Sequence, residues 1–239
     1  MSTTMVDGVL RALHATLPSD SVITDPQRLR TFECDGLAAY RVVPAVVVLP
    51  ETAEQVQEVV RACAEHNVPF VARGSGTGLS GGALPHSEGV LVVLSKMRRI
   101  LEVDLDNERA VVEPGVINLD VTKEVSDRGY YFAPDPSSQQ VCSVGGNVAE
   151  NSGGAHCLKY GFTTHHILGV EMVTPEGDLI ELGGPAREGP GYDLLGTVVG
   201  SEGTLGVVTK ITVRLLRKPE KVQTLLAGFP STDSAGAAV

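Results

Sequence analysis

The glycine-rich segment between residues 71 and 82 constrains the fold of this chain more than any other feature. It reads Val71-Ala-Arg-Gly-Ser-Gly-Thr-Gly-Leu-Ser-Gly-Gly82 and lies between two apolar runs, residues 68–72 and 90–94. Glycine lets consecutive backbone N–H groups turn toward one point, where they bind an anion such as phosphate. The flanking runs are typical of buried strands. The segment therefore predicts a phosphate-binding loop between two strands.

Within this glycine loop, Gly76, Gly78 and Gly81 have the spacing of the dinucleotide-binding fingerprint of Rossmann folds. In that fold a helix begins inside the motif, and its N-terminus receives the pyrophosphate. Here the motif is followed by further glycine and by Pro85, which disfavour a helix. We therefore expect loop amides to hold the phosphates without a helix dipole. A flexible surface loop is the alternative, and the buried strands on both sides argue against it.

Composition narrows the class of protein. The chain has 239 residues, enough for one large or two modest domains, and its 42% hydrophobic and 20% charged residues are ordinary for an α/β protein. A net charge of -10 and the lack of tryptophan argue against a nucleic-acid partner. No apolar run approaches the roughly 20 residues of a membrane span, and the N-terminus lacks a signal-peptide pattern. We therefore expect a cytoplasmic protein.

The cysteines give no sign of a cross-link or a metal site. Cys34, Cys63, Cys142 and Cys157 have no Cys-x-x-Cys spacing and no accompanying pair of histidines. In a cytoplasmic protein this pattern is typical of reduced thiols. We therefore expect neither a disulfide framework nor a bound metal.

The pattern of elements changes near residue 90. Before it, a strand bracketed by prolines, residues 44–50, leads through a helix with a capping box at Thr52 and Gln55 to the strand before the glycine loop. This order predicts a right-handed βαβ unit, which places the loop at the C-terminal end of a strand. After it, antiparallel pairs are expected without long helices between them, at residues 100–104 with 110–113 and 168–174 with 178–182. We infer two lobes with a ligand between them.

Three further stretches are rich in small residues: residues 133–138, 142–154 and 200–208. Such density lets a flat, extended ligand lie directly against the backbone. Each stretch alone could instead serve tight turns, for example at Gly145-Gly146. Four small-residue loops in one chain favour the ligand-binding interpretation.

Other polar residues give weaker signals. His156, His165 and His166 invite a metal or acid–base interpretation, but no carboxylate is spaced in the sequence to orient any of them. We therefore expect structural histidines. Ser201 lacks the G-x-S-x-G surroundings of a nucleophilic serine, and Ser231 is expected to cap a helix.

Together these motifs resemble the FAD-binding domain of the vanillyl-alcohol oxidase and p-cresol methylhydroxylase superfamily. Within it, they are most similar to the flavin subunits of bacterial glycolate oxidases, with D-lactate and D-2-hydroxyglutarate dehydrogenases as near relatives. The resemblance implies an α+β, two-lobed FAD-binding domain of the p-cresol methylhydroxylase type, with a small βαβ-containing lobe and a larger mixed or antiparallel sheet flanked by helices. The stretches that carry it are residues 72–82, 134–138, 145–154, 159–161, 191–194 and 200–206.

The resemblance also implies how the chain is divided. Residues 1–40 would form an N-terminal helical segment and residues 41–218 the FAD-binding domain, with lobe one at about 41–98 and lobe two at about 99–218. Residues 219–239 would begin a cap domain that is cut short. In the relatives, the cap carries the groups that bind the hydroxy acid and serve as base. No catalytic residue is therefore expected in this chain.

The implied cofactor is FAD, carried over residue by residue. The ribityl and isoalloxazine side would lie against Pro134, Asp135 and Ser138, and the adenine against Glu202, Gly203 and Val208. The central part of the dinucleotide would lie against Ser143, Gly145, Gly146, Asn147, Asn151 and Gly153, with Gly161 as a further position. The pyrophosphate would lie against the glycine loop at Arg73, Gly74, Ser75, Gly76, Thr77, Gly78, Leu79, Ser80, Gly81 and Gly82. Residues 76–78 lack the histidine that tethers flavin in some members, so the FAD is expected to be non-covalent.

The implied reaction is the oxidation of a small 2-hydroxy acid, glycolate or D-lactate, to the 2-oxo acid, with FAD as hydride acceptor. Electrons would leave through an iron–sulfur partner subunit, which could also associate the protein with a membrane. The chain alone is expected to be nearly inactive. Two alternatives stay open, a non-catalytic FAD-binding subunit that relays electrons and a flavin reductase of cell-wall precursor synthesis.

Overall fold

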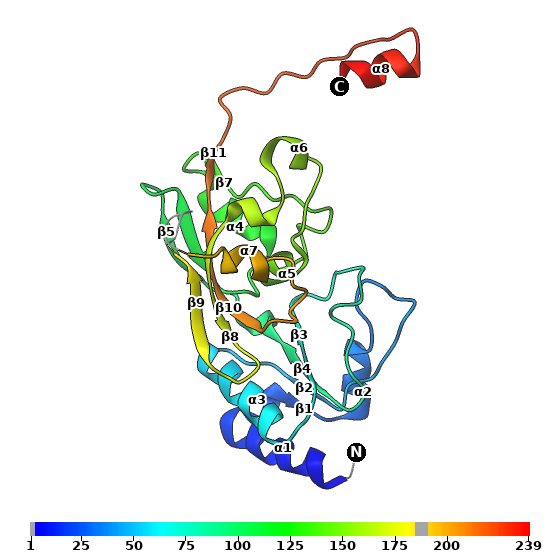
Figure 1. The fold of residues 1–239 in the computed structure, drawn as a ribbon, viewed down its shortest axis with the longest axis vertical. Coiled ribbons are helices and arrows are strands. Elements are labelled where there is room, and N and C mark those ends of the chain that lie inside the picture. Colours follow the sequence, from blue (N-terminus) through cyan, green and yellow to red (C-terminus); the bar gives the residue numbers. More distant parts are fainter. Residues whose placement is uncertain (1–2, 185–190) are drawn as a thin grey trace.

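The computed structural model describes residues 3–184 and 191–239, and Figure 1 shows two stacked lobes from which the C-terminal end extends. In lobe one, the strands lie in the order β1-β2-β4-β3, with β2, β4 and β3 parallel. This confirms the predicted βαβ unit, because α3 joins two parallel strands. The elements are α1 (Thr3–Thr16), β1 (Val22–Ile23), α2 (Pro26–Leu29), β2 (Val46–Val48), α3 (Ala53–Glu65), β3 (Phe70–Arg73) and β4 (Val90–Val93), with 3-10 turns at Ser19–Ser21, Arg30–Phe32 and Leu94–Lys96.

The core of lobe one forms between α3, α1 and one face of the sheet. Val56, Val59 and Val60 recur at helical spacing along α3 and are fully buried, and Val9 and Leu13 of α1 pack into the same cluster. The first helix thus belongs to the core of lobe one, and β1 pairs antiparallel with β2 at the edge of its sheet.

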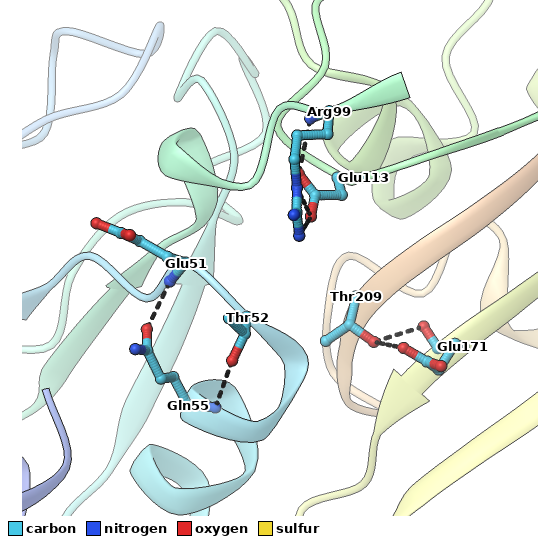
Figure 2. A network of polar contacts seen from close by, with 7 residues as sticks. All are labelled: Glu51, Thr52, Gln55, Arg99, Glu113, Glu171 and Thr209. Carbon is cyan, nitrogen blue, oxygen red and sulfur yellow. Dashed lines mark hydrogen bonds and ion pairs between the residues drawn. The ribbon is translucent and has the colours of Figure 1, made fainter. Parts of the chain in front are cut away.

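The start of α3 differs in one bond from the predicted capping box. As predicted, the Thr52 hydroxyl accepts a hydrogen bond from the backbone N–H of Gln55, at 3.3 Å. The Gln55 side-chain oxygen, however, accepts from the N–H of Glu51 at 2.7 Å, one residue before the cap (Figure 2). The prediction of a reciprocal bond to Thr52 itself was therefore wrong, and the Gln55 amide caps the preceding N–H instead.

Cys63 lies on the buried face of α3, and burial raises the pKa of its thiol to about 12. Only the thiolate reacts with alkylating reagents, so we expect iodoacetamide at about pH 8 to leave Cys63 unmodified in the native protein. After unfolding in guanidinium, the same reagent should label it, as peptide mass spectrometry would show. Labelling of native protein at the rate of the unfolded chain would contradict this burial.

Lobe two is built on a five-stranded antiparallel sheet in the order β5-β6-β10-β8-β9. Buried and half-buried residues alternate along β10, the central strand, so that one face packs on the core of the lobe. Its elements are β5 (Ile100–Asp104), β6 (Arg109–Val112), α4 (Asn118–Ser126), β7 (Tyr130–Tyr131), α5 (Val144–Glu150), α6 (Cys157–Tyr160), a 3-10 turn (Thr163–His166), β8 (Ile167–Val173), β9 (Leu179–Gly183), α7 (Leu194–Val198), β10 (Val207–Arg214) and β11 (Leu216–Arg217), which pairs with β7. Both predicted antiparallel pairs are confirmed.

An ion pair fixes the passage from lobe one to lobe two. Glu113 is 4% exposed, and its carboxylate accepts from the backbone N–H, Nε and Nη2 of Arg99 at 2.6–2.9 Å (Figure 2). Gly115 packs so closely on this turn that a Cβ would lie 2.6 Å from the Met97 carbonyl oxygen. The ion pair lies at the start of lobe two, and the Gly115 contact packs the segment after β6 against the end of lobe one.

The structure corrects the prediction of a loop at residues 142–154. Residues 144–150 form α5, in which Ser143 caps the Gly146 N–H at 3.3 Å and left-handed Asn151 ends the helix. Glycine has low helix propensity, but Val144 and Val148 of α5 are fully buried in lobe two. Burial of this face outweighs the cost of two glycines.

The C-terminal end leaves lobe two as an extended arm that carries α8 (Thr232–Ala238) (Figure 1). Ser231 caps α8 through the Ser234 N–H, which confirms the predicted cap. The arm's apolar side chains are exposed, including Val222, Leu225 and Leu226. Nowhere in the described ranges, 3–184 and 191–239, is a helix both long and apolar enough to cross a membrane.

Candidate cofactor site

A cavity of about 670 Å³ opens between the two lobes. The glycine loop of lobe one forms one wall, and α5 with the turn around Glu202 forms the opposite wall. Its volume lies within the roughly 300–1,000 Å³ typical of small-molecule sites. We call it the interlobe cavity.

The glycine loop has the predicted structure. It connects the parallel neighbours β3 and β4 without a helix, and Gly76 and Gly81 take positive φ angles of 67° and 83°. Gly74 touches the opposite wall, because a Cβ there would overlap the Ser143 hydroxyl and lie 3.5 Å from the Gly146 nitrogen. Only a residue without a side chain lets the two walls approach this closely.

Most of the residues predicted to contact FAD line the interlobe cavity. The exceptions are Gly81, Pro134, Asp135 and Gly161, which do not line it. Pro134 is buried, and its carbonyl accepts a hydrogen bond from Asn118, which in turn accepts one from Asn147. The predicted residues that do line the cavity are Arg73, Gly74, Ser75, Gly76, Thr77, Gly78, Leu79, Ser80, Gly82, Ser138, Ser143, Gly145, Gly146, Asn147, Asn151, Gly153, Glu202, Gly203 and Val208.

The chemistry of the walls fits a dinucleotide. Backbone and small polar side chains dominate the glycine loop, as a diphosphate requires. The two acidic residues of the lining, Glu150 and Glu202, are acceptors suited to ribose hydroxyl or amino groups. Glu150 already accepts from the Ser80 hydroxyl at 2.7 Å. One cavity thus offers donors for phosphate and acceptors for sugar or base.

Residues able to tether a flavin are scarce around the cavity. Among the described lining residues there is no histidine, and the only thiol is that of Cys142, which is 4% exposed. Burial raises the pKa of the Cys142 thiol, so it is a poor nucleophile near neutral pH. That the FAD is dissociable stays a prediction, which release of flavin on acid precipitation would test.

The sequence analysis missed one pair at the end of this region. Asp135 and His156 are 21 positions apart, yet the His156 Nδ1 and an Asp135 carboxylate oxygen lie 2.6 Å apart. The expectation that His156 lacks a carboxylate partner was therefore wrong. The pair forms because Gly154 packs directly on the Asp135 backbone, where a Cβ would overlap it. The spacing of residues along the sequence does not predict such a long-range contact.

The other two histidines singled out in the sequence, His165 and His166, contact the protein backbone. His166 is 2% exposed, and its Nε2 lies 2.9 Å from the Tyr160 carbonyl oxygen. His165 accepts from the Phe162 N–H through Nδ1. The four cysteines are free thiols. Within the described ranges no group of three or more His, Cys, Asp or Glu side chains could hold a metal ion.

A mixed sheet whose glycine loop joins two parallel strands and faces a five-stranded antiparallel lobe defines a two-lobed dinucleotide-binding protein. Residues 44–183 match the family model described as "FAD binding domain". The chain therefore belongs to this FAD-binding family, and FAD is its cofactor. The predicted family and cofactor are confirmed.

Curated relatives extend over nearly the whole chain. It is 49% identical over 231 residues to the glycolate oxidase subunit GlcD of Escherichia coli, which covers 97% of this chain and 46% of the relative. It is 36% identical to a D-2-hydroxyglutarate dehydrogenase of Stutzerimonas stutzeri, covering 93% and 48%, and 35% identical to a D-lactate dehydrogenase of Anaerostipes hadrus, covering 87% and 44%. The chain thus spans about half the length of the curated relatives it matches.

Solved structures share the fold. An alkyldihydroxyacetonephosphate synthase superposes with a TM-score of 0.79 at 26% identity, over 89% of this chain and 41% of that chain. Substrate-bound p-cresol methylhydroxylase superposes with a TM-score of 0.77 at 21% identity, over 92% and 45%. The predicted α+β fold of the p-cresol methylhydroxylase type is confirmed.

Proposed function

We propose that this chain is the FAD-binding half of an oxidoreductase that converts a small 2-hydroxy acid, glycolate or D-lactate, to the 2-oxo acid. The interlobe cavity carries the proposal, since it matches a dinucleotide in volume and chemistry. The names of the relatives support the substrate class, because all three refer to 2-hydroxy acids.

In this role the bound flavin supplies the hydride acceptor. The protein's contribution is to bind and orient it: the glycine loop grips the diphosphate, and α5 with the Glu202 turn closes the opposite side. The Asp135–His156 pair lies outside the lining of the interlobe cavity and has no assigned role in the reaction. The groups that grip the hydroxy acid remain assigned to a cap domain.

Partners and location form part of the same proposal. The Escherichia coli relative is named as a subunit, which supports a multi-subunit assembly. We assign the electron acceptor to an iron–sulfur partner subunit in the cytoplasm, with membrane association only through partners. The alternative is an FAD-binding subunit that relays electrons without oxidising a substrate, and the exposed α8 arm would suit such an attachment.

The test is anaerobic reduction of the flavin in the gene product as it is expressed in the cell. We expect FAD to be released by acid precipitation, and its visible absorbance to bleach on mixing with glycolate or D-lactate but not with NADPH. Bleaching by NADPH alone would instead support the reductase. A flavin that binds but responds to none of these donors would support the relay subunit.

A further inference from the structure

A short segment outside the interlobe cavity packs against the back of the glycine loop. Residues 32–37 follow α2, and we call them the backing segment. A Cβ on Gly36 would lie 2.7 Å from the Thr77 carbonyl oxygen and 2.6 Å from that of Gly78. Leu37 reaches the loop further along, with its Cδ2 4.0 Å from a Cβ built on Gly81. The backing segment therefore limits where the loop can lie.

The Arg73 side chain joins the loop to the backing segment. Its guanidinium turns back under the loop, so that a Cβ on Gly76 would lie 2.5 Å from Nε and 2.6 Å from Cζ. Its Nη1 donates to the Phe32 carbonyl oxygen at 3.3 Å. The glycine loop thus curls around the Arg73 guanidinium, which is held by the Phe32 carbonyl of the backing segment.

Asp35 is the buried acidic residue of the backing segment. It is 7% exposed, and its Oδ1 accepts from the Leu37 N–H at 2.8 Å. Its Oδ2 is buried and has no hydrogen-bond partner among the described residues. Burial lowers the pKa of Arg73, and the negative charge of Asp35 opposes that shift. A buried carboxylate oxygen without a donor costs stability, and the positive charge of Arg73 offsets part of that cost.

The backing segment is itself held in place. The Glu33 carboxylate is paired with Arg41 at 2.9 Å and Arg30 at 3.5 Å, and the Val42 N–H donates to the Glu33 carbonyl at 2.7 Å. A fixed segment can impose one conformation on a glycine-rich loop that would otherwise sample many.

We propose that the backing segment preorganises the glycine loop for FAD, and that Asp35 is a positioning residue that acts through Arg73. A preformed loop does not lose conformational entropy when the diphosphate binds, so affinity rises. On this view Arg73, although it lines the interlobe cavity, braces the loop and does not ligate phosphate directly. Nothing in this proposal depends on the substrate.

The experiment titrates the FAD-free chain with FAD, following quenching of flavin fluorescence, for Asp35→Asn, Arg73→Gln and the double variant. Asparagine keeps the oxygen that accepts from Leu37 and removes only the charge. We expect each single variant to raise the Kd by at least about tenfold, and the double variant to be no more than about threefold worse than the weaker single variant. Asp25→Asn is the matched control, because Asp25 is an exposed cap whose role asparagine can fill.

The salt dependence of FAD binding distinguishes an arginine that braces the loop from one that contacts phosphate directly. A cation that touches phosphate contributes to the salt dependence of binding, whereas a brace does not. We expect Arg73→Gln to weaken binding without changing the slope of log Kd against log salt concentration. A flattened slope, a multiplicative double variant, or Asp35→Asn that binds FAD as tightly as the wild type would each overturn the proposal.

Gly36→Ala tests the same contact without changing any charge. Its new methyl group would press on the Thr77 and Gly78 carbonyls. We expect a Kd increase of at least about tenfold, with wild-type affinity for Gly228→Ala, since nothing lies within 4 Å of a Cβ there. If Asp35→Asn does not fold, this pair decides the question, and unchanged affinity in Gly36→Ala would overturn the proposal.

Discussion

Replacing Gly74 by valine is expected to weaken FAD binding by at least about 100-fold, which corresponds to roughly 2.7 kcal/mol. Gly74 is the point where the glycine loop touches α5, and a Cβ would overlap the Ser143 hydroxyl. The branched side chain must push the two walls of the interlobe cavity apart, so neither can hold its part of the dinucleotide. Equilibrium titration with FAD measures the loss, with Gly228→Val as control.

A suppressor variant identifies the cause of that loss. In Gly74→Ala the closest obstacle is the Ser143 oxygen alone, because the next atoms are at 3.5 and 3.6 Å. Combining it with Ser143→Ala removes the obstacle while keeping the Ser143 Cβ. We expect the double variant to bind FAD more tightly than Gly74→Ala. If it binds more weakly still, the Ser143 hydroxyl matters more to FAD than the space at Gly74 does.

Replacing Leu91 by alanine should lower the free energy of unfolding by about 3 kcal/mol. Leu91 is fully buried in β4, the strand between β2 and β3, and packs with Val47 and Ile23. The cavity left behind cannot collapse, because strands on both sides fix the backbone. Urea denaturation of the FAD-free chain measures the change.

Leu101→Ala provides the comparison for that variant. Leu101 is 44% exposed on β5, a strand at the edge of the other sheet. The same deletion there should change stability by less than about 1 kcal/mol. Equal losses in the two variants would show that β4 does not form the core we describe.

Local patterns in the sequence were enough to locate the elements of lobe one. The prolines around residues 46–48, the threonine before α3 and the period of its valines each act within a few residues, so the chain order β2-α3-β3 could be read directly. The glycine loop was equally local, since several glycines with Pro85 after them disfavour a helix.

Where tertiary contacts compete with local preference, prediction failed. Residues 144–150 contain two glycines and read as a loop, but burial of Val144 and Val148 makes them helical. The Asp135–His156 pair joins positions far apart in sequence, and burial of the Asp35 carboxylate was not predicted either.

The sequence alone indicated the class of ligand, because a run of glycines after a strand leaves backbone amides that favour an anion, and its motif set resembled that of FAD-binding proteins. The tertiary structure decided everything that depends on distance between segments. The approach of Gly74 to α5 arises from packing of the two lobes, and the bond from Arg73 to Phe32 and the carboxylate beside His156 arise from packing within each part. Such contacts are set by the summed burial of many side chains, which no short stretch of residues encodes.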